Sequence, residues 1–97
     1  MKLNDVIKKM RAAHDMGRSA YIEVTIPGQR ATEFIVNSCE SIENKIAYYE
    51  GAYDENGIHR RNSDIKIVGA GDASELVSIL FGDLRKGEQE RAEASLC

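Results

Sequence analysis

The stretch that decides the fold is IVNSCESIENKIAYYEGAY, residues 35–53. It opens with apolar residues typical of the end of a strand and continues through Asn37, Ser38 and Ser41, which favour a helix start. In the run that follows, four apolar residues fall within about 60° of one another on a helical wheel: Ile42, Ile46, Tyr49 and Tyr53. We therefore predict a helix that packs this stripe on a sheet and leaves Tyr48 facing outward.

A helix and a β-hairpin are predicted before this stretch. Between Leu3 and Met16 the apolar residues recur at spacings of three and four, which is typical of one face of a helix. Apolar and polar residues then alternate from Ala20 to Ile26, as in a half-buried strand. Pro27-Gly28 supplies a turn, and the chain returns as a second strand from Thr32 to Val36.

One more strand and one more helix are predicted after it, with the strand from Asp64 to Val68. The next residues, Gly69-Ala70-Gly71-Asp72, could belong to a nucleotide-binding loop, but the third glycine of that motif is absent. Asp72 with Glu75 fits a helix capping box, which we favour. The last helix has a wide apolar arc, which predicts a homodimer or partner surface centred on Ile79 and Phe81.

These elements predict an α+β fold of the order αββαβα. A small, three-stranded, mainly antiparallel sheet packs against helices. Residues 1–87 form a single domain, and residues 88–97 form a charged tail that is frayed or disordered.

Composition and charge narrow the classes of function. Thirteen basic and sixteen acidic residues give a net charge of −3, which argues against direct, sequence-specific nucleic-acid binding. Two cysteines, Cys39 and Cys97, are too few for a disulfide framework and predict a reduced chain. The sequence has neither a signal peptide's apolar region nor an apolar run of the roughly 20 residues that span a bilayer. We therefore expect a cytoplasmic protein that has no membrane partner.

No residue pattern in the sequence is typical of catalysis. The sequence contains no Cys-x-x-Cys, no pair of histidines at ligand spacing, no P-loop and no Gly-x-Ser-x-Gly. We therefore predict a protein that is not an enzyme and that uses no metal or cofactor.

Two groups of residues are candidates for binding. The first is an acidic edge with an outward tyrosine as its anchor: Glu40, Glu43, Tyr48, Glu50, Asp54 and Glu55. The second is the basic triplet His59, Arg60 and Arg61, which could hold a phosphate or an acidic partner. A solvated loop is the simpler interpretation of the triplet, because no aromatic residues are interleaved with it.

Several segments resemble small proteins of phages and prophages of Gram-positive bacteria: Leu3 to Lys9, the hairpin Tyr21 to Val36, and above all Ile35 to Asn37 followed by Ile42 to Tyr49 and Ala52 to Glu55. The resemblance covers roughly residues 1–71. The order of elements is also similar to that of small anti-CRISPR inhibitors of Cas9, whose acidic residues cover the surface that reads the PAM. This chain departs from that group in being less acidic and in carrying the basic triplet.

The resemblance implies a phage-derived inhibitory protein in the host cytoplasm. It would block a host defence protein, such as a Cas nuclease, by stoichiometric contact through the acidic edge. One alternative is a sponge that sequesters a nucleotide immune signal, with the basic triplet on the phosphates and a tyrosine stacked on the base. The other is an oligomeric scaffold without catalytic activity.

Overall fold

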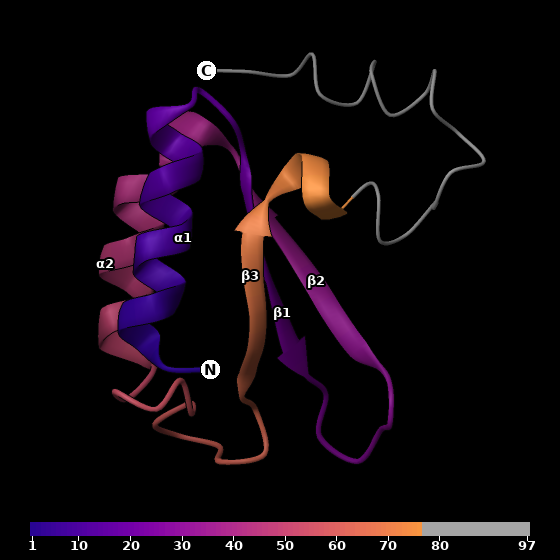
Figure 1. Ribbon diagram of the computed structural model, residues 1–97. Helices are drawn as coiled ribbons and strands as arrows, with labels where there is room; N and C mark the ends of the chain where they lie inside the picture. Colours follow the sequence, from indigo (N-terminus) through magenta and orange to yellow (C-terminus); the bar gives the residue numbers. More distant parts are fainter. Residues whose placement is uncertain (77–97) are drawn as a thin grey trace, which may run out of the picture.

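The computed structural model describes residues 1–76 of the chain (Figure 1). Its elements are α1 (Leu3–Asp15), β1 (Ala20–Thr25), β2 (Thr32–Asn37), the 3-10 helix η1 (Cys39–Ser41), α2 (Ile42–Ala52) and β3 (Ile67–Asp72). A helical turn follows at residues 73–76. The predicted α+β class is confirmed. The predicted interface at Ile79 and Phe81 and the predicted tail lie outside the described residues.

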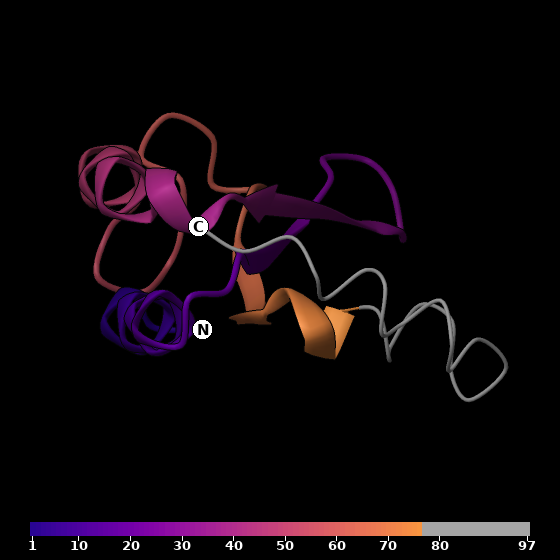
Figure 2. The same ribbon diagram turned by 90° about the horizontal axis from the view of Figure 1, so that it is seen from above.

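The sheet has the strand order β2-β1-β3, and both neighbours run antiparallel to β1. In the middle of the sheet, Ile22 on β1 pairs with Ile35 on one side and Ala70 on the other. The hairpin turn between β1 and β2 contains Gly28 at φ 75°, the left-handed conformation that the predicted turn requires. Both helices lie on the same side of the sheet (Figure 2), so one sheet face carries the core.

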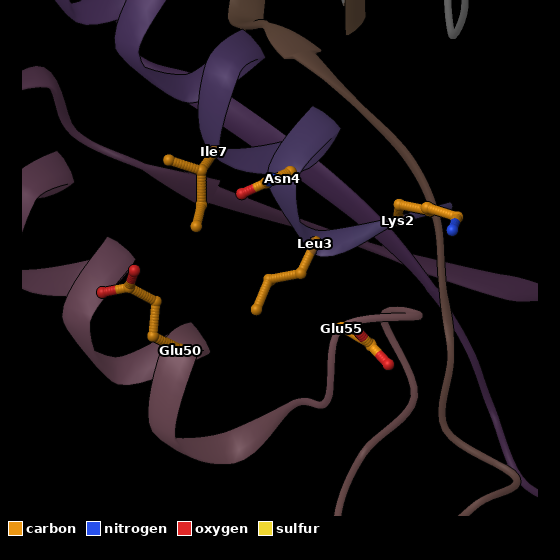
Figure 3. A pocket seen from close by; sticks show the side chains of 6 residues that line it. All are labelled: Lys2, Leu3, Asn4, Ile7, Glu50 and Glu55. Atoms are coloured by element: carbon orange, nitrogen blue, oxygen red, sulfur yellow. The ribbon is translucent and has the colours of Figure 1, made fainter.

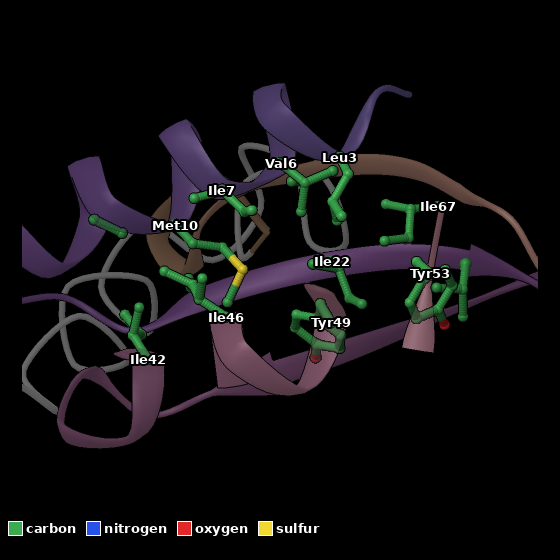
Figure 4. Close-up of a cluster of buried hydrophobic side chains, with 14 residues drawn as sticks. Leu3, Val6, Ile7, Met10, Ile22, Ile42, Ile46, Tyr49, Tyr53 and Ile67 are labelled. Carbon is green, nitrogen blue, oxygen red and sulfur yellow. The ribbon is translucent and has the colours of Figure 1, made fainter. Parts of the chain in front are cut away.

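The core lies between this sheet face and the two helices (Figure 4). The apolar face of α1 is buried as predicted and consists of Leu3, Val6, Ile7, Met10 and Ala13. The stripe of α2 is buried too: Ile42, Ile46, Tyr49 and Tyr53 are each at most 6% exposed. Tyr48, the residue next to Tyr49, is 59% exposed, so the predicted orientation of the helix is confirmed.

The third strand begins later than predicted. The sequence favours Asp64–Val68, but β3 runs over Ile67–Asp72, so the Gly-x-Gly segment lies in the strand and not in a connecting loop. Gly71 pairs with Tyr21 on β1, and a Cβ at Gly71 would come within 3.0 Å of the Tyr21 ring. A glycine avoids crowding where the backbone passes this close to a large side chain. Because glycines have no side chain, alternation along the sequence could not reveal these strand positions.

The residues after β3 form the predicted capping box. The Asp72 carboxylate accepts from the backbone N–H groups of Ser74 (2.9 Å) and Glu75 (3.2 Å), and Glu75 Oε1 accepts from the Asp72 N–H (3.1 Å). Burial acts to raise the pKa of Asp72, but hydrogen bonds from Ser74 and Glu75, together with nearby Arg18, lower it overall. The carboxylate therefore stabilises the fold above its ordinary pKa, and this contribution is lost as pH falls through the lowered value.

The start of α2 differs from the prediction. Neither Ser38 nor Ser41 caps a helix with its side chain, and the short η1 leads into α2 instead. Asn37 is buried, and its Nδ2 donates a hydrogen bond of 3.0 Å to the hydroxyl oxygen of Tyr49. A buried tyrosine hydroxyl needs a polar partner, which explains why Asn37 faces the core and not the helix end.

Cys39, at the start of η1, is buried and is not a free thiol. The prediction of a reduced cysteine is therefore wrong at this position. A count of two cysteines excludes a framework of several disulfides, but it does not determine the state of a single sulfur.

We expect Asn37→Ala to destabilise the fold by about 1–3 kcal/mol, because it leaves the Tyr49 hydroxyl buried without its partner. Urea unfolding of the variants Asn37→Ala, Tyr49→Phe and the double variant measures the coupling between the two side chains. The double variant should lose less stability than the sum of the single losses. Additive losses would show that the hydrogen bond does not stabilise the fold.

Candidate functional site

A hollow of about 550 Å³ lies against the exposed side of α2. We call it the Tyr48 hollow. Small residues of α2 and the basic triplet line it around the tyrosine: Ala47, Gly51, Ala52, His59, Arg60 and Arg61. The structure thus brings Tyr48 together with the basic triplet, two features that the sequence placed in separate candidate groups.

The exposed Tyr48 ring contacts two neighbours on α2. Its edge contacts the ring of buried Tyr49, with the centroids 5.5 Å apart, and Lys45 Nζ lies 5.8 Å from the Tyr48 centroid. Lys45 precedes Tyr48 by three residues, whereas Gly51 follows it by three. Of the two residues three positions from Tyr48 in α2, one is therefore a cation and the other has no side chain.

A row of aromatic contacts connects the two walls of the hollow through the core. The Tyr49 and Tyr53 centroids lie 6.0 Å apart, and the Tyr53 ring meets the His59 ring edge-on at 5.1 Å. Burial raises the pKa of both Tyr49 and Tyr53, so these phenols stay neutral over the physiological range. Their role in the site is to position Tyr48 and His59.

Backbone hydrogen bonds hold the basic loop against the end of α2. The Arg60 N–H donates to the Ala52 carbonyl (2.9 Å), the His59 N–H donates to the Ile65 carbonyl (2.9 Å), and the Arg61 N–H donates to His59 Nδ1 (3.1 Å). The position of Arg60 therefore follows from main-chain pairing, and that of Arg61 depends in addition on the imidazole of His59.

The turn before the triplet is fixed by Asp54 and Gly57. The Asp54 Oδ1 accepts from the N–H groups of Asn56 (2.9 Å) and Ile58 (3.0 Å), which is typical of an Asx turn. Gly57 has φ 75°, and a Cβ added there would overlap the carbonyl oxygen of Met1. The Met1 amino group in turn donates to the Ile67 carbonyl (2.9 Å), so the residues before α1 fasten the loop to β3.

The guanidinium groups of Arg60 and Arg61 make no ion pair within residues 1–76. The ion pairs in that part of the chain join Arg11 to Glu43 and Arg18 to Asp72, each at 3.6 Å. Arginine presents a planar set of donors that matches phosphate and carboxylate oxygens. The Tyr48 hollow thus combines an exposed aromatic ring with two such cations.

The acidic candidates do not gather on one surface with Tyr48. Glu50 and Glu55 line a second hollow of about 270 Å³ beside Leu3 and Ile7, between α1 and the end of α2 (Figure 3). We call this the acidic hollow. Glu43 lies on the same side of α2, two turns before Glu50, where its partner is Arg11.

Two acidic candidates lie apart from the acidic hollow. Glu40 is exposed on η1, before α2 begins. Asp54 uses its carboxylate for the turn described above. In the described part of the chain, no three His, Cys, Asp or Glu residues are arranged to hold a metal ion, and no helix there is long and apolar enough to cross a membrane.

Comparisons with protein-family models, curated proteins and solved structures gave no match to this chain. We therefore classify the protein by its fold alone. It is an α+β domain in which two helices cover one face of an antiparallel sheet. Among residues 1–76, the Tyr48 hollow and the acidic hollow contain binding residues predicted from the sequence, and we take them as candidate sites.

We expect Gly57→Ala to destabilise the protein more than Gly28→Ala. Both glycines have φ 75°, so each substitution forces a left-handed alanine at a cost of about 1–2 kcal/mol. Only Gly57 has a neighbouring atom where the Cβ would lie, because nothing is within 4 Å of that position at Gly28. Equal shifts of the urea unfolding midpoint would show that the contact with Met1 does not constrain the loop.

Proposed function

We propose that this protein is a non-catalytic binding domain that captures a phosphorylated small molecule in the Tyr48 hollow. The observation that carries the proposal is the convergence of Tyr48, Arg60 and Arg61 on one hollow. Its volume of about 550 Å³ lies within the range of small-molecule sites, roughly 300–1,000 Å³.

The distribution of charge supports a compact anion as the ligand. The whole chain carries −3, so the positive charge at the hollow is local. A long polyanion would extend beyond the hollow and meet acidic side chains such as Glu43 and Glu50. A small phosphorylated molecule can contact both guanidinium groups without that repulsion.

The chemistry of the lining supports capture over conversion. The residues around the hollow include neither a serine or cysteine nucleophile nor a carboxylate. His59 uses Nδ1 to accept from the Arg61 N–H, so this ring nitrogen is occupied in holding the loop. These features favour the nucleotide sponge among the functions expected from the sequence, because a sponge needs affinity and no reaction.

We expect isothermal titration calorimetry to show one AMP or ADP bound per chain. Arg60→Glu and Arg61→Glu should each weaken binding roughly tenfold to a hundredfold, the effect of losing a hydrogen bond to a charged group. Arg30→Glu is the matched control, because Arg30 lies in the hairpin turn and carries the same charge change. Absence of one-to-one binding by both nucleotides, or an equal loss in Arg30→Glu, would contradict the proposal.

The acidic hollow favours a second candidate function. Glu50 and Glu55 line this hollow together with Lys2 and Asn4, next to the core residues Leu3 and Ile7 (Figure 3). Two carboxylates and one cation leave the hollow acidic, which complements a basic protein surface. This arrangement supports a phage-derived inhibitor that binds a host defence protein such as a Cas nuclease. The contact would use Glu43, Glu50 and Glu55, since Asp54 is committed to the turn.

A cleavage assay with purified Cas9 tests this second function. Cleavage should fall to background at about one inhibitor per nuclease, and the triple variant Glu43→Lys, Glu50→Lys, Glu55→Lys should restore it. Asp15→Lys, at the other end of α1, controls for a change of charge elsewhere. Uninhibited cleavage with the native protein, or full inhibition by the triple variant, would rule out this contact.

A further inference from the structure

Neither the backbone nor the packing requires a glycine at position 51. Gly51 lies in the last turn of α2, and it is not among the glycines with positive φ. A Cβ added there would meet no atom within 4 Å. What the missing side chain does provide is open space in the Tyr48 hollow, which Gly51 lines.

That space lies beside the Tyr48 ring. Side chains on a helix lean toward its N-terminus, so a residue covers the surface of the turn that precedes it. A side chain at position 51 would therefore lean toward Tyr48, three residues earlier. Lys45 occupies the corresponding position before the ring, with its Nζ 5.8 Å from the centroid. Gly51 thus leaves the side of Tyr48 that faces the hollow uncovered.

Two cations line the same hollow as this uncovered ring. Arg60 and Arg61 project from the loop that is paired to the end of α2 through the Ala52 carbonyl. Together the two walls offer a flat apolar surface and a pair of phosphate donors within one volume of about 550 Å³. A nucleotide carries matching parts, a flat base that stacks on aromatic rings and a phosphate that binds arginine.

We infer that the ligand is a nucleotide whose base lies over Gly51 against the Tyr48 ring, and that Gly51 is the specificity-determining residue. This inference rests on the proposed capture of a phosphorylated molecule, and it adds the requirement for a flat ring. Ribose 5-phosphate carries the same sugar and phosphate as AMP but lacks the base. The difference in affinity between the two probes therefore measures the contribution of the base.

The experiment titrates AMP and ribose 5-phosphate into the native protein and two leucine variants. Native protein should bind AMP at least about tenfold more tightly than ribose 5-phosphate. Gly51→Leu fills the space beside Tyr48, so it should reduce AMP affinity to that of ribose 5-phosphate and leave ribose 5-phosphate binding unchanged. Ala12→Leu places the same side chain on the exposed side of α1, outside the lining of the Tyr48 hollow, and should bind both probes like native protein.

Gly51→Ala separates an effect on binding from an effect on folding. Alanine favours a helix over glycine and would meet no atom here, so the thermal unfolding midpoint should rise while AMP affinity stays within about twofold of native. Equal affinities for AMP and ribose 5-phosphate in the native protein would overturn the inference and leave the proposed function standing. Native AMP affinity in Gly51→Leu would overturn it as well, whereas binding of neither probe would refute the proposed function itself.

Discussion

The rotational phase of α2 is the constraint on which the rest of the structure depends. Successive residues of a helix lie about 100° apart, so the burial of Tyr49 forces its neighbour Tyr48 to project away from the core. The same phase places Gly51 and Ala52 next to Tyr48 and turns Glu43 and Glu50 toward α1. The buried Asn37 supports this phase, because its hydrogen bond to the Tyr49 hydroxyl is available only in one orientation of the helix. The core stripe therefore determines what the exposed surface of α2 presents.

Closure of the loop between α2 and β3 is the second requirement for the site. The loop folds back far enough for the Arg60 N–H to reach the carbonyl of Ala52, and it is held there by short-range backbone bonds. Gly57 supplies a left-handed turn in a place where a larger residue would meet Met1. These contacts couple the start of α1 to the basic wall of the hollow. A change near the N-terminus can thus alter the position of Arg60 and Arg61 without touching either side chain.

Sequence patterns were informative wherever side chains repeat with the period of an element. The helix before Gly17, the hairpin around Gly28 and the stripe of α2 all follow from such repeats, and so does the exposure of Tyr48. The bounds of β3 could not be predicted in this way, because Gly69 and Gly71 have no side chains with which to show alternation. The proximity of Tyr48 to Arg60 was equally hidden, since it arises from loop hydrogen bonds that involve backbone atoms of almost any residue. Asp54 is the converse case: an acidic residue that resembled a surface contact holds the turn instead.

The two hollows beside α2 carry opposite charge, and this arrangement bears on what each could bind. Glu50 and Glu55 belong to a protein with a net charge of −3, so its long-range field is weakly repulsive to any anion. An anion at the Tyr48 hollow must therefore gain its affinity from contacts made within the hollow, which requires close approach of its charge to both guanidinium groups. At physiological ionic strength, charges more than about 8 Å apart are largely screened, which confines the influence of each hollow to its own side of the helix. In the proposed function, the net charge disfavours polymers while the local pair of arginines favours a compact phosphate, and the two together select the ligand by size.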